Sequence, residues 1–295
     1  MSARYPGGVV RKNQLVPTTS SASGMWTIGQ AAQATKSDIW PYSNIGMPIS
    51  QSLRFRASAS AYLQRTPGSA ATSSQKWTWS GWVKRGTLGT LQAIFSSGTS
   101  NITLVHFQAD NTLRIRNSTV EYVTTQLFRD PSAWYHIVVV YDSANATSTD
   151  RVQIYVNGVR QSVSYTTGPF AQNTSSKINS ALGHFLGKMD YTAIYPDCYM
   201  AEIYFVDGQA LAPTSFGGFD TNGVWQPLAY TGTFGTNGFY VDFSDNSGTT
   251  ATTLGKDYSG NGNNWTPNNI SLTAGVTYDW MLDSPTNALS SSTGI

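Results

Sequence analysis

Residues 134–158 constrain the fold more than any other stretch of the chain. Residues 134–142 have the sequence Trp-Tyr-His-Ile-Val-Val-Val-Tyr-Asp, a β-branched and aromatic run that predicts a strand buried on both faces. Residues 151–158 alternate apolar and polar side chains, which predicts a strand with one face on a core. Asn157 and Gly158 are typical of a tight hairpin turn, because both turn positions need positive φ. The stretch therefore predicts antiparallel β-sheet.

Further strand-like segments recur on both sides of this hairpin. They are separated by turns rich in Gly, Pro, Asn and Asp, and they lie at 53–56, 62–65, 77–84, 91–95, 103–107, 113–116, 121–127, 177–186, 199–207 and 238–243. Strands at intervals of roughly 8–12 residues indicate a sandwich or a barrel. We expect the following side chains to face into the core between the sheets: Trp82, Val138, Val140, Ile154, Val156 and Ile203.

Composition excludes several classes of protein. Only 12% of the residues are charged and the net charge is +2, which gives no electrostatic case for nucleic-acid binding. No apolar run approaches the roughly 20 residues that span a bilayer, so we expect no membrane insertion. Cys198 is the only cysteine, which excludes an internal disulfide and a cysteine-based zinc site. Residues 1–10 lack the apolar core of a signal peptide, so release by lysis within a virus particle would fit.

The N-terminal segment has a different character. Residues 1–24 are dominated by Pro, Gly, Ser and Thr, and a capping box at Thr27 and Gln30 predicts a short helix over 28–36. The segment also carries apolar side chains that need a surface to cover them: Tyr5, Val9, Val10, Trp26, Ile28 and Trp40. We expect an extended arm at 1–48 that becomes ordered on a partner protein; a disordered tail is the alternative.

A known family resembles the central part of the chain. Residues 51–215 are similar to the laminin-G-like domains of the concanavalin A-like lectin and glucanase superfamily. The landmarks, in order, are the segments 52–55, 79–84, 94–96, 134–136, 155–158, 182–183 and 201–205. The resemblance implies an all-β jelly-roll sandwich of two antiparallel sheets. We therefore expect a sandwich at 49–219 and, at 220–295, a C-terminal β extension that packs on it and ends flexibly.

The flanks resemble structural proteins of tailed bacteriophages. The matching segments are 5–8, 23–27, 238–245, 256–266 and 283–287. This resemblance implies a non-enzymatic protein of the virion surface that is anchored to other virion proteins through its arm and assembled as a homotrimer. The leading expectation is a tail-fibre or tail-tip adhesin that binds a host surface glycan or receptor. A capsid decoration or head-fibre protein is one alternative, and a glycan-active hydrolase is another.

The sequence contains none of the catalytic motifs considered for this fold. The glucanases of this superfamily carry Glu-x-Asp-x-x-Glu, whereas Glu121 and Glu202 are the only glutamates here and neither lies in that motif. The three histidines, His106, His136 and His184, accompany no nucleophile motif, so we expect them to be structural. We therefore expect no enzymatic activity.

Two kinds of binding site remain as candidates. Aromatic side chains in or near loops could stack on sugar rings: Tyr165, Phe170, Tyr191 and Tyr195. The Asp- and Asn-rich stretch 257–263 could supply oxygen ligands to calcium through Asp257, Asn261 and Asn263. A glycine-rich turn, in which these side chains bond their own backbone, is the alternative. No cofactor other than this calcium is expected.

Overall fold

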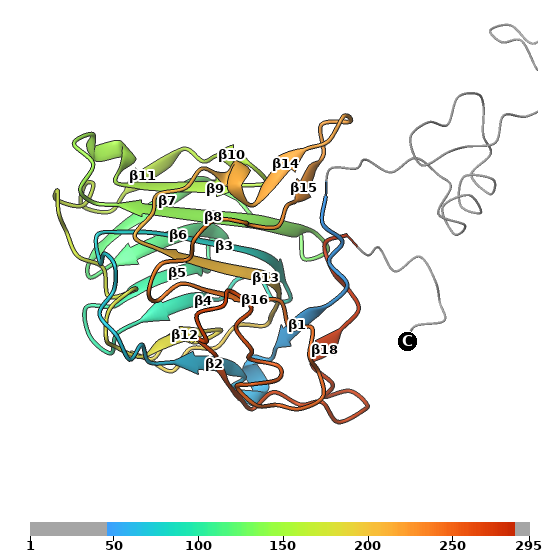
Figure 1. Ribbon diagram of the computed structural model, residues 1–295. Coiled ribbons are helices and arrows are strands. Elements are labelled where there is room, and N and C mark those ends of the chain that lie inside the picture. Colours follow the sequence, from blue (N-terminus) through green and yellow to red (C-terminus); the bar gives the residue numbers. More distant parts are fainter. Residues whose placement is uncertain (1–45, 287–295) are drawn as a thin grey trace, which may run out of the picture.

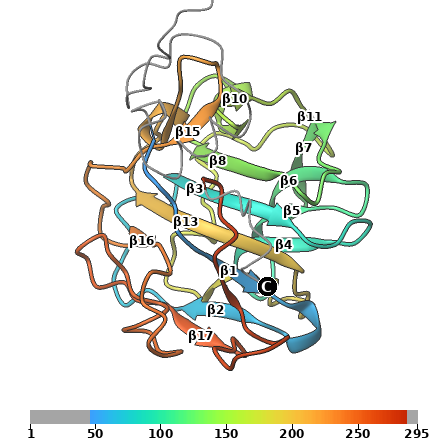
Figure 2. The same cartoon turned by 90° about the vertical axis from the view of Figure 1, so that its right-hand side faces the viewer.

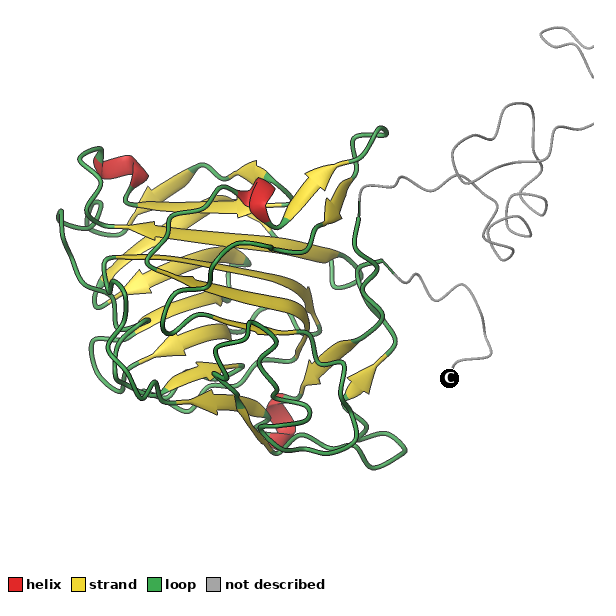
Figure 3. Ribbon diagram, viewed as in Figure 1, coloured by secondary structure: helices red, strands yellow, loops and turns green. Residues whose placement is uncertain are grey.

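The described part of the chain, residues 46–286 of a computed structural model, consists of two large antiparallel sheets packed as a sandwich (Figures 1, 2 and 3). This confirms the all-β sandwich expected from the sequence. The helix predicted over 28–36 lies outside the described residues. So do the predicted anchoring residues Tyr5, Val9, Val10, Trp26, Ile28 and Trp40.

The first sheet contains the hairpin predicted at 134–158. Its order is β10 (Val159–Arg160), β9 (Val152–Val156), β8 (Trp134–Asp142), β3 (Lys76–Arg85), β13 (Cys198–Asp207), β1 (Ser52–Phe55) and β18 (Trp280–Met281), with β16 (Phe239–Val241) also paired to β13. Asn157 and Gly158 have φ values of 48° and 76°, as the predicted turn requires. β1 and β16 follow each other along the same edge of β13, because they pair with its first and second halves.

The second sheet forms the other layer, which Figure 2 shows beside the first. Its order is β11 (Val163–Tyr165), β7 (Val120–Leu127), β6 (Thr112–Asn117), β5 (Thr103–Phe107), β4 (Gln92–Ser97), β12 (His184–Leu186), β2 (Tyr62–Arg65) and β17 (Thr266–Asn268). A separate pair joins β14 (Gly217–Phe219) to β15 (Trp225–Pro227), and short 3-10 turns occupy Ala57–Ala59, Ser148–Asp150 and Pro213–Ser215. The strand predicted over 177–186 is shorter than expected, since only its last three residues pair.

Large aromatic side chains fill the space between the sheets. The Trp77 ring stacks on Tyr141 with centroids 5.1 Å apart, and Phe95 meets Phe205 edge-on at 5.7 Å. Burying such rings supplies most of the hydrophobic stabilisation of a sandwich. Of the side chains predicted to face inward, Ile154, Val156 and Ile203 lie in this core.

The other three predicted core residues face the opposite side of the first sheet. Val138 and Val140 pack with Tyr204 and Phe216, while Trp82 packs with Trp225. The prediction of their direction was wrong because residues 211–240 form a further layer over the sheet (orange in Figure 1). With apolar side chains on both faces of β8, the sequence did not distinguish the two sides.

The C-terminal residues join the sandwich rather than a separate core. β16 and β18 extend the first sheet and β17 extends the second. The Asp279 carboxylate accepts hydrogen bonds from Nε of Arg54 and of Arg56, at 3.1 and 2.6 Å, which fastens the approach to β18 onto β1. The backbone N–H of Ile49 donates to Oγ1 of Thr286 at 2.7 Å, so the described chain begins and ends at one place.

Candidate functional site

The outward face of the second sheet has uncovered polar side chains at both ends. Alternation along each strand directs every second residue outward, namely Tyr62 and Gln64 on β2, Leu104 and His106 on β5, Arg114 and Arg116 on β6, and Glu121 and Val123 on β7. Residues 187–197 cross the middle of this face, where Met189 and Ile194 pack on Ala93 and Leu104. Two separate polar regions therefore remain.

A polar pocket occupies the end formed by β2 and β17. We call it the amide pocket, and it is lined by Gln64, Arg65, Thr66, Gly68, Gly262, Asn263, Asn264, Thr266 and Asn268. Strand pairing sets Thr266 opposite Gln64 and Asn268 opposite Tyr62. Side-chain amides and hydroxyls both donate and accept hydrogen bonds, which suits the hydroxyl groups of a saccharide.

Aromatic rings lie next to this pocket. The Tyr62 ring is 5.9 Å from Tyr195 and 6.1 Å from Phe185. Phe185 is buried, whereas Tyr62 and Tyr195 are half-buried and retain exposed surface. Because Tyr62 and Gln64 are two residues apart on β2, both side chains stand on the same face. Nζ of Lys188 lies over the Tyr62 ring, 4.7 Å from its centroid, so only the remaining exposed surface of the ring adjoins the amides.

The stretch 257–263, predicted as a calcium loop, contributes Gly262 and Asn263 to the wall of the amide pocket. Oδ1 of Asp257 accepts the N–H groups of Tyr240 and Ser259 at 2.9 and 2.8 Å. Oδ2 accepts the Ser259 hydroxyl at 2.8 Å and the Asn263 N–H at 2.7 Å. Four donors fill the acceptor positions of this carboxylate, so the loop as folded does not fit a calcium ion. The arrangement corresponds to the turn that was the alternative interpretation.

The asparagines predicted as calcium ligands, Asn261 and Asn263, fix the position of this loop. Nδ2 of Asn261 donates to the carbonyl oxygens of Gly235 and Gly238 at 2.7 and 2.9 Å, and Nδ2 of Asn263 also donates to Gly238, at 2.8 Å. Oδ1 of Asn263 accepts a hydrogen bond from Arg65. Among residues 46–286, no group of three or more His, Cys, Asp or Glu side chains is placed to hold a metal.

The four aromatic residues predicted as a sugar platform do not come together. Phe170 is 3% exposed and packs on Tyr122 at 4.8 Å, so its assignment to a glycan site is corrected: it is a core residue. Tyr165, on the edge strand β11, meets Tyr122 edge-on. Tyr195 lies beside β2 near the other end of the same sheet, and Tyr191 is 57% exposed between Met189 and Ile194. Tyr62 was missed because the sequence does not show which faces stay uncovered.

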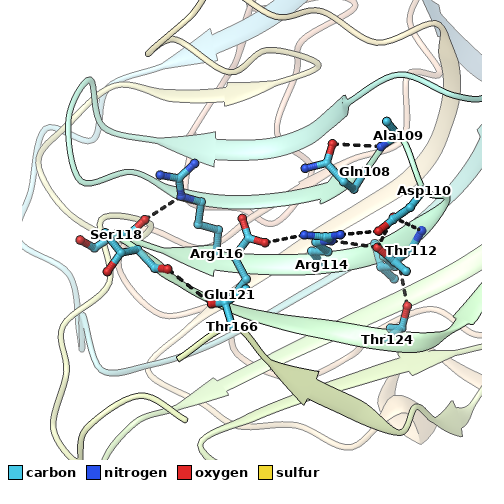
Figure 4. Close-up of polar contacts among 12 residues, drawn as sticks. Gln108, Ala109, Asp110, Thr112, Arg114, Arg116, Ser118, Glu121, Thr124 and Thr166 are labelled. Atoms are coloured by element: carbon cyan, nitrogen blue, oxygen red, sulfur yellow. Dashed lines mark hydrogen bonds and ion pairs between the residues drawn. The ribbon is translucent and has the colours of Figure 1, made fainter. Parts of the chain in front are cut away.

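The opposite end of the outward face carries an ion-pair network (Figure 4). Arg114 bonds Glu121 through Nη1 at 2.7 Å and Asp110 through Nη2 at 2.5 Å, while its Nε donates to Thr112 Oγ1 at 2.8 Å. Arg116 donates from Nε to the carbonyl oxygen of Ser118 at 2.6 Å. We call this region, formed by Asp110, Arg114, Arg116 and Glu121, the arginine end. Its two carboxylates offset its two guanidinium charges, so it has little net charge.

The two glutamates lie on opposite sides of the sandwich. Glu121 belongs to the arginine end of the second sheet, while Glu202 is buried at a bulge of β13 between the tyrosines Tyr204 and Tyr240. Retaining glycosidases hold their two carboxyl groups only about 5.5 Å apart. Glu121 and Glu202 therefore do not form a catalytic pair.

The three histidines are all buried, as expected for structural side chains. Burial lowers the pKa of His106 and of His184 to about 4, and that of His136 to about 3. Each ring is consequently neutral near pH 7. Over residues 46–286 we also find no helix with the length and apolar character needed to cross a membrane.

Comparison with known proteins agrees with this fold. A family described as the concanavalin A-like lectin/glucanases superfamily matches residues 57–202. Comparison with curated proteins gave no match. A proposed carbohydrate-binding protein from Bacteroides ovatus has a similar solved structure, with 15% identity and a TM-score of 0.51. The match covers 78% of this chain and 59% of that protein.

Two further solved structures show more limited similarity. A heptameric SAP-like pentraxin from Limulus polyphemus has 16% identity and a TM-score of 0.34, over 52% of this chain and 78% of that one. The CBM40 of the Ruminococcus gnavus IT-sialidase, solved with α2,3 sialyllactose, has 11% identity and a TM-score of 0.34, over 54% and 89%. The family match and the two-sheet architecture show that the chain contains, at residues 57–202, a domain of the concanavalin A-like lectin/glucanase superfamily.

Proposed function

We propose that the protein is a non-enzymatic carbohydrate-binding protein whose glycan site is the amide pocket together with Tyr62 and Tyr195. One observation carries this proposal: neutral amides and hydroxyls line a pocket that adjoins half-exposed aromatic rings. Sugars present hydroxyl groups at their edges and C–H groups on their faces, so they need both kinds of contact. The lectin-like fold and the carbohydrate-binding role proposed for the Bacteroides protein support it.

We further propose that the protein acts on the surface of a bacteriophage virion, as an adhesin of a tail fibre or tail tip. The support is the resemblance of its flanking segments to phage structural proteins. In this proposal residues 1–48 anchor the protein to other virion proteins, and the chain forms a homotrimer whose repeated sites add avidity. Residues 46–286 begin and end at one place on the sandwich, beside Ile49.

A capsid decoration or head-fibre protein would have the same arm but a different position. A labelled antibody against the sandwich separates the two: the adhesin proposal predicts label at the tail, and label on the head would overturn it. Deleting residues 1–48 should leave a folded domain that no longer enters particles. Incorporation at normal occupancy would contradict the anchoring role.

Glycan binding is tested by applying the purified protein to an array of bacterial surface oligosaccharides. We expect wild type to bind, and Tyr62→Ala and Asn268→Ala each to reduce binding because they remove a ring and an amide of the same site. Arg116→Gln is the matched control, since it alters the far end of the same face. Melting temperatures verify that each variant is folded. Equal binding by all four proteins would overturn the site.

The non-enzymatic part of the proposal has its own assay. Wild type should release no new reducing ends from any polysaccharide that it binds. If it does release them and the Glu121→Gln, Glu202→Gln double variant does not, the protein is a glycan-active hydrolase instead.

A further inference from the structure

Arg65 is the only ionisable side chain among the described residues that line the amide pocket. It is the last residue of β2, where it pairs with His184 of β12, so the sheet fixes its backbone. Its side chain leaves β2 on the side opposite Tyr62 and Gln64, the side of Leu63, and it lines the pocket at the end of the strand. Its Nη2 donates to Oδ1 of Asn263. Among residues 46–286 this is the one hydrogen bond that the guanidinium makes; the group has five N–H donors in a rigid fork and so keeps donors for a ligand.

The surroundings of Arg65 favour an anionic partner. Burial lowers its pKa, and attraction to Asp257 acts in the opposite direction. The group nevertheless remains charged, because arginine does not lose its proton in proteins. The Asp257 carboxylate does not take up the N–H donors of Arg65, because its oxygens accept hydrogen bonds from Tyr240, Ser259 and Asn263 instead. A partly desolvated cation with donors to spare is best satisfied by a planar carboxylate held through two parallel hydrogen bonds.

We propose that the saccharide taken by the amide pocket is acidic, and that Arg65 binds the carboxylate of a uronic-acid-type sugar. The neutral residues of the pocket, such as Gln64 and Asn268, then contact the hydroxyl groups of the same sugar. This inference rests on the proposed glycan-binding function and specifies its ligand class. Arg114, at the other end of the second sheet, already bonds Glu121 and Asp110 and is not available in the same way.

The test compares two trisaccharides of one linkage, tri-galacturonic acid and galactotriose, which differ only by carboxylate in place of hydroxymethyl. Calorimetric titration of the full chain should give at least about tenfold tighter binding of the acid. Arg65→Gln should make the two affinities equal by weakening binding of the acid alone. Arg116→Gln removes one positive charge from the far end of the same sheet without touching the pocket, and it should preserve the preference.

The outcomes separate this inference from the proposed function. If wild type binds both trisaccharides equally, Arg65 does not select an acid, while glycan binding stands. If wild type binds neither of them, nor any saccharide of the array, both proposals fail. If Arg65→Gln does not fold, the test uses the methyl ester of tri-galacturonic acid, which lacks the negative charge, with wild type. Wild type should bind this ester no more tightly than galactotriose. If it binds the ester as tightly as the free acid, the inference is overturned.

Discussion

The indole Nε1 of Trp225 donates a hydrogen bond to Nδ1 of His136 over 2.8 Å. Since Nδ1 accepts, the proton of the neutral imidazole lies on Nε2, which donates to Oγ of Ser80 at 2.9 Å. Ser80 therefore receives a hydrogen bond from the histidine and is not activated by it. The contact instead fastens β15, which lies beyond residues 57–202, to the centre of the first sheet.

The first prediction concerns this contact. Trp225→Phe leaves Nδ1 of His136 without its donor in a buried site, and the free energy of unfolding should fall by about 2–3 kcal/mol. Urea denaturation measures the change. Val224→Ala is the control, because Val224 is 53% exposed and should matter by less than about 0.5 kcal/mol. Equal stability of the two variants would show that the contact is incidental.

The second prediction concerns Glu202, whose carboxylate is buried at a residue with φ of 51°. Burial raises its pKa to about 7, although hydrogen bonds donated by Tyr240 at 2.6 Å and Tyr204 at 3.0 Å oppose the shift. Between about pH 4.5 and 7 this carboxyl ionises in the unfolded chain but not in the folded one. The free energy of unfolding contributed by this group therefore falls as pH rises through that window and is constant above it.

Glu202→Gln removes this dependence while keeping an acceptor for both tyrosines. Relative to wild type, the variant should gain stability as pH rises from 4.5 to 8, by an amount on the order of 3 kcal/mol. The lowered pKa values of the three histidines act in the opposite direction below pH 6.5, but both proteins share them. Urea titrations across this range measure the difference, and parallel curves for the two proteins would contradict the account.

A third prediction concerns the attachment of the C-terminal residues. Asp279 is fully buried and its carboxylate bonds Arg54, Arg56 and the backbone N–H of Ser271. Asp279→Asn should lower the free energy of unfolding by about 3 kcal/mol, because two guanidinium groups lose their anion. Asp283→Asn breaks the more exposed pair with Lys84 and should cost at most about 1 kcal/mol. Thermal melts of the two variants give the comparison.

The sequence predicted some features of the fold and of the candidate site and missed others, depending on whether local or distant residues determine them. The pattern at 134–158 determined β8, β9 and the turn at Asn157 because apolar runs and Asn-Gly are local signals. The directions of Val138 and Val140 were not predictable, since the layer that covers them comes from distant residues. Phe170 and Tyr62 show the same limit for the site: one is buried and the other half-exposed only because of tertiary packing.

The fourth prediction follows from the bonding of Asp257. Because donors already fill its acceptor positions, millimolar calcium should leave the melting temperature unchanged, and a chelator should have no effect. A calcium-dependent rise in melting temperature that is absent in Asn263→Ala would restore the calcium site predicted from the sequence.

The central claim is that ligand binds in the amide pocket, at the β2–β17 end of the second sheet. Its most direct test is an NMR titration of isotopically labelled protein with tri-galacturonic acid, following side-chain amide signals of Asn263, Asn264 and Asn268 and the Nε signals of Arg65 and Arg116. We predict saturable shifts of the three asparagines and Arg65, with Arg116 unchanged. Shifts confined to Arg116 and its neighbours, with the amide pocket unaffected, would contradict the account.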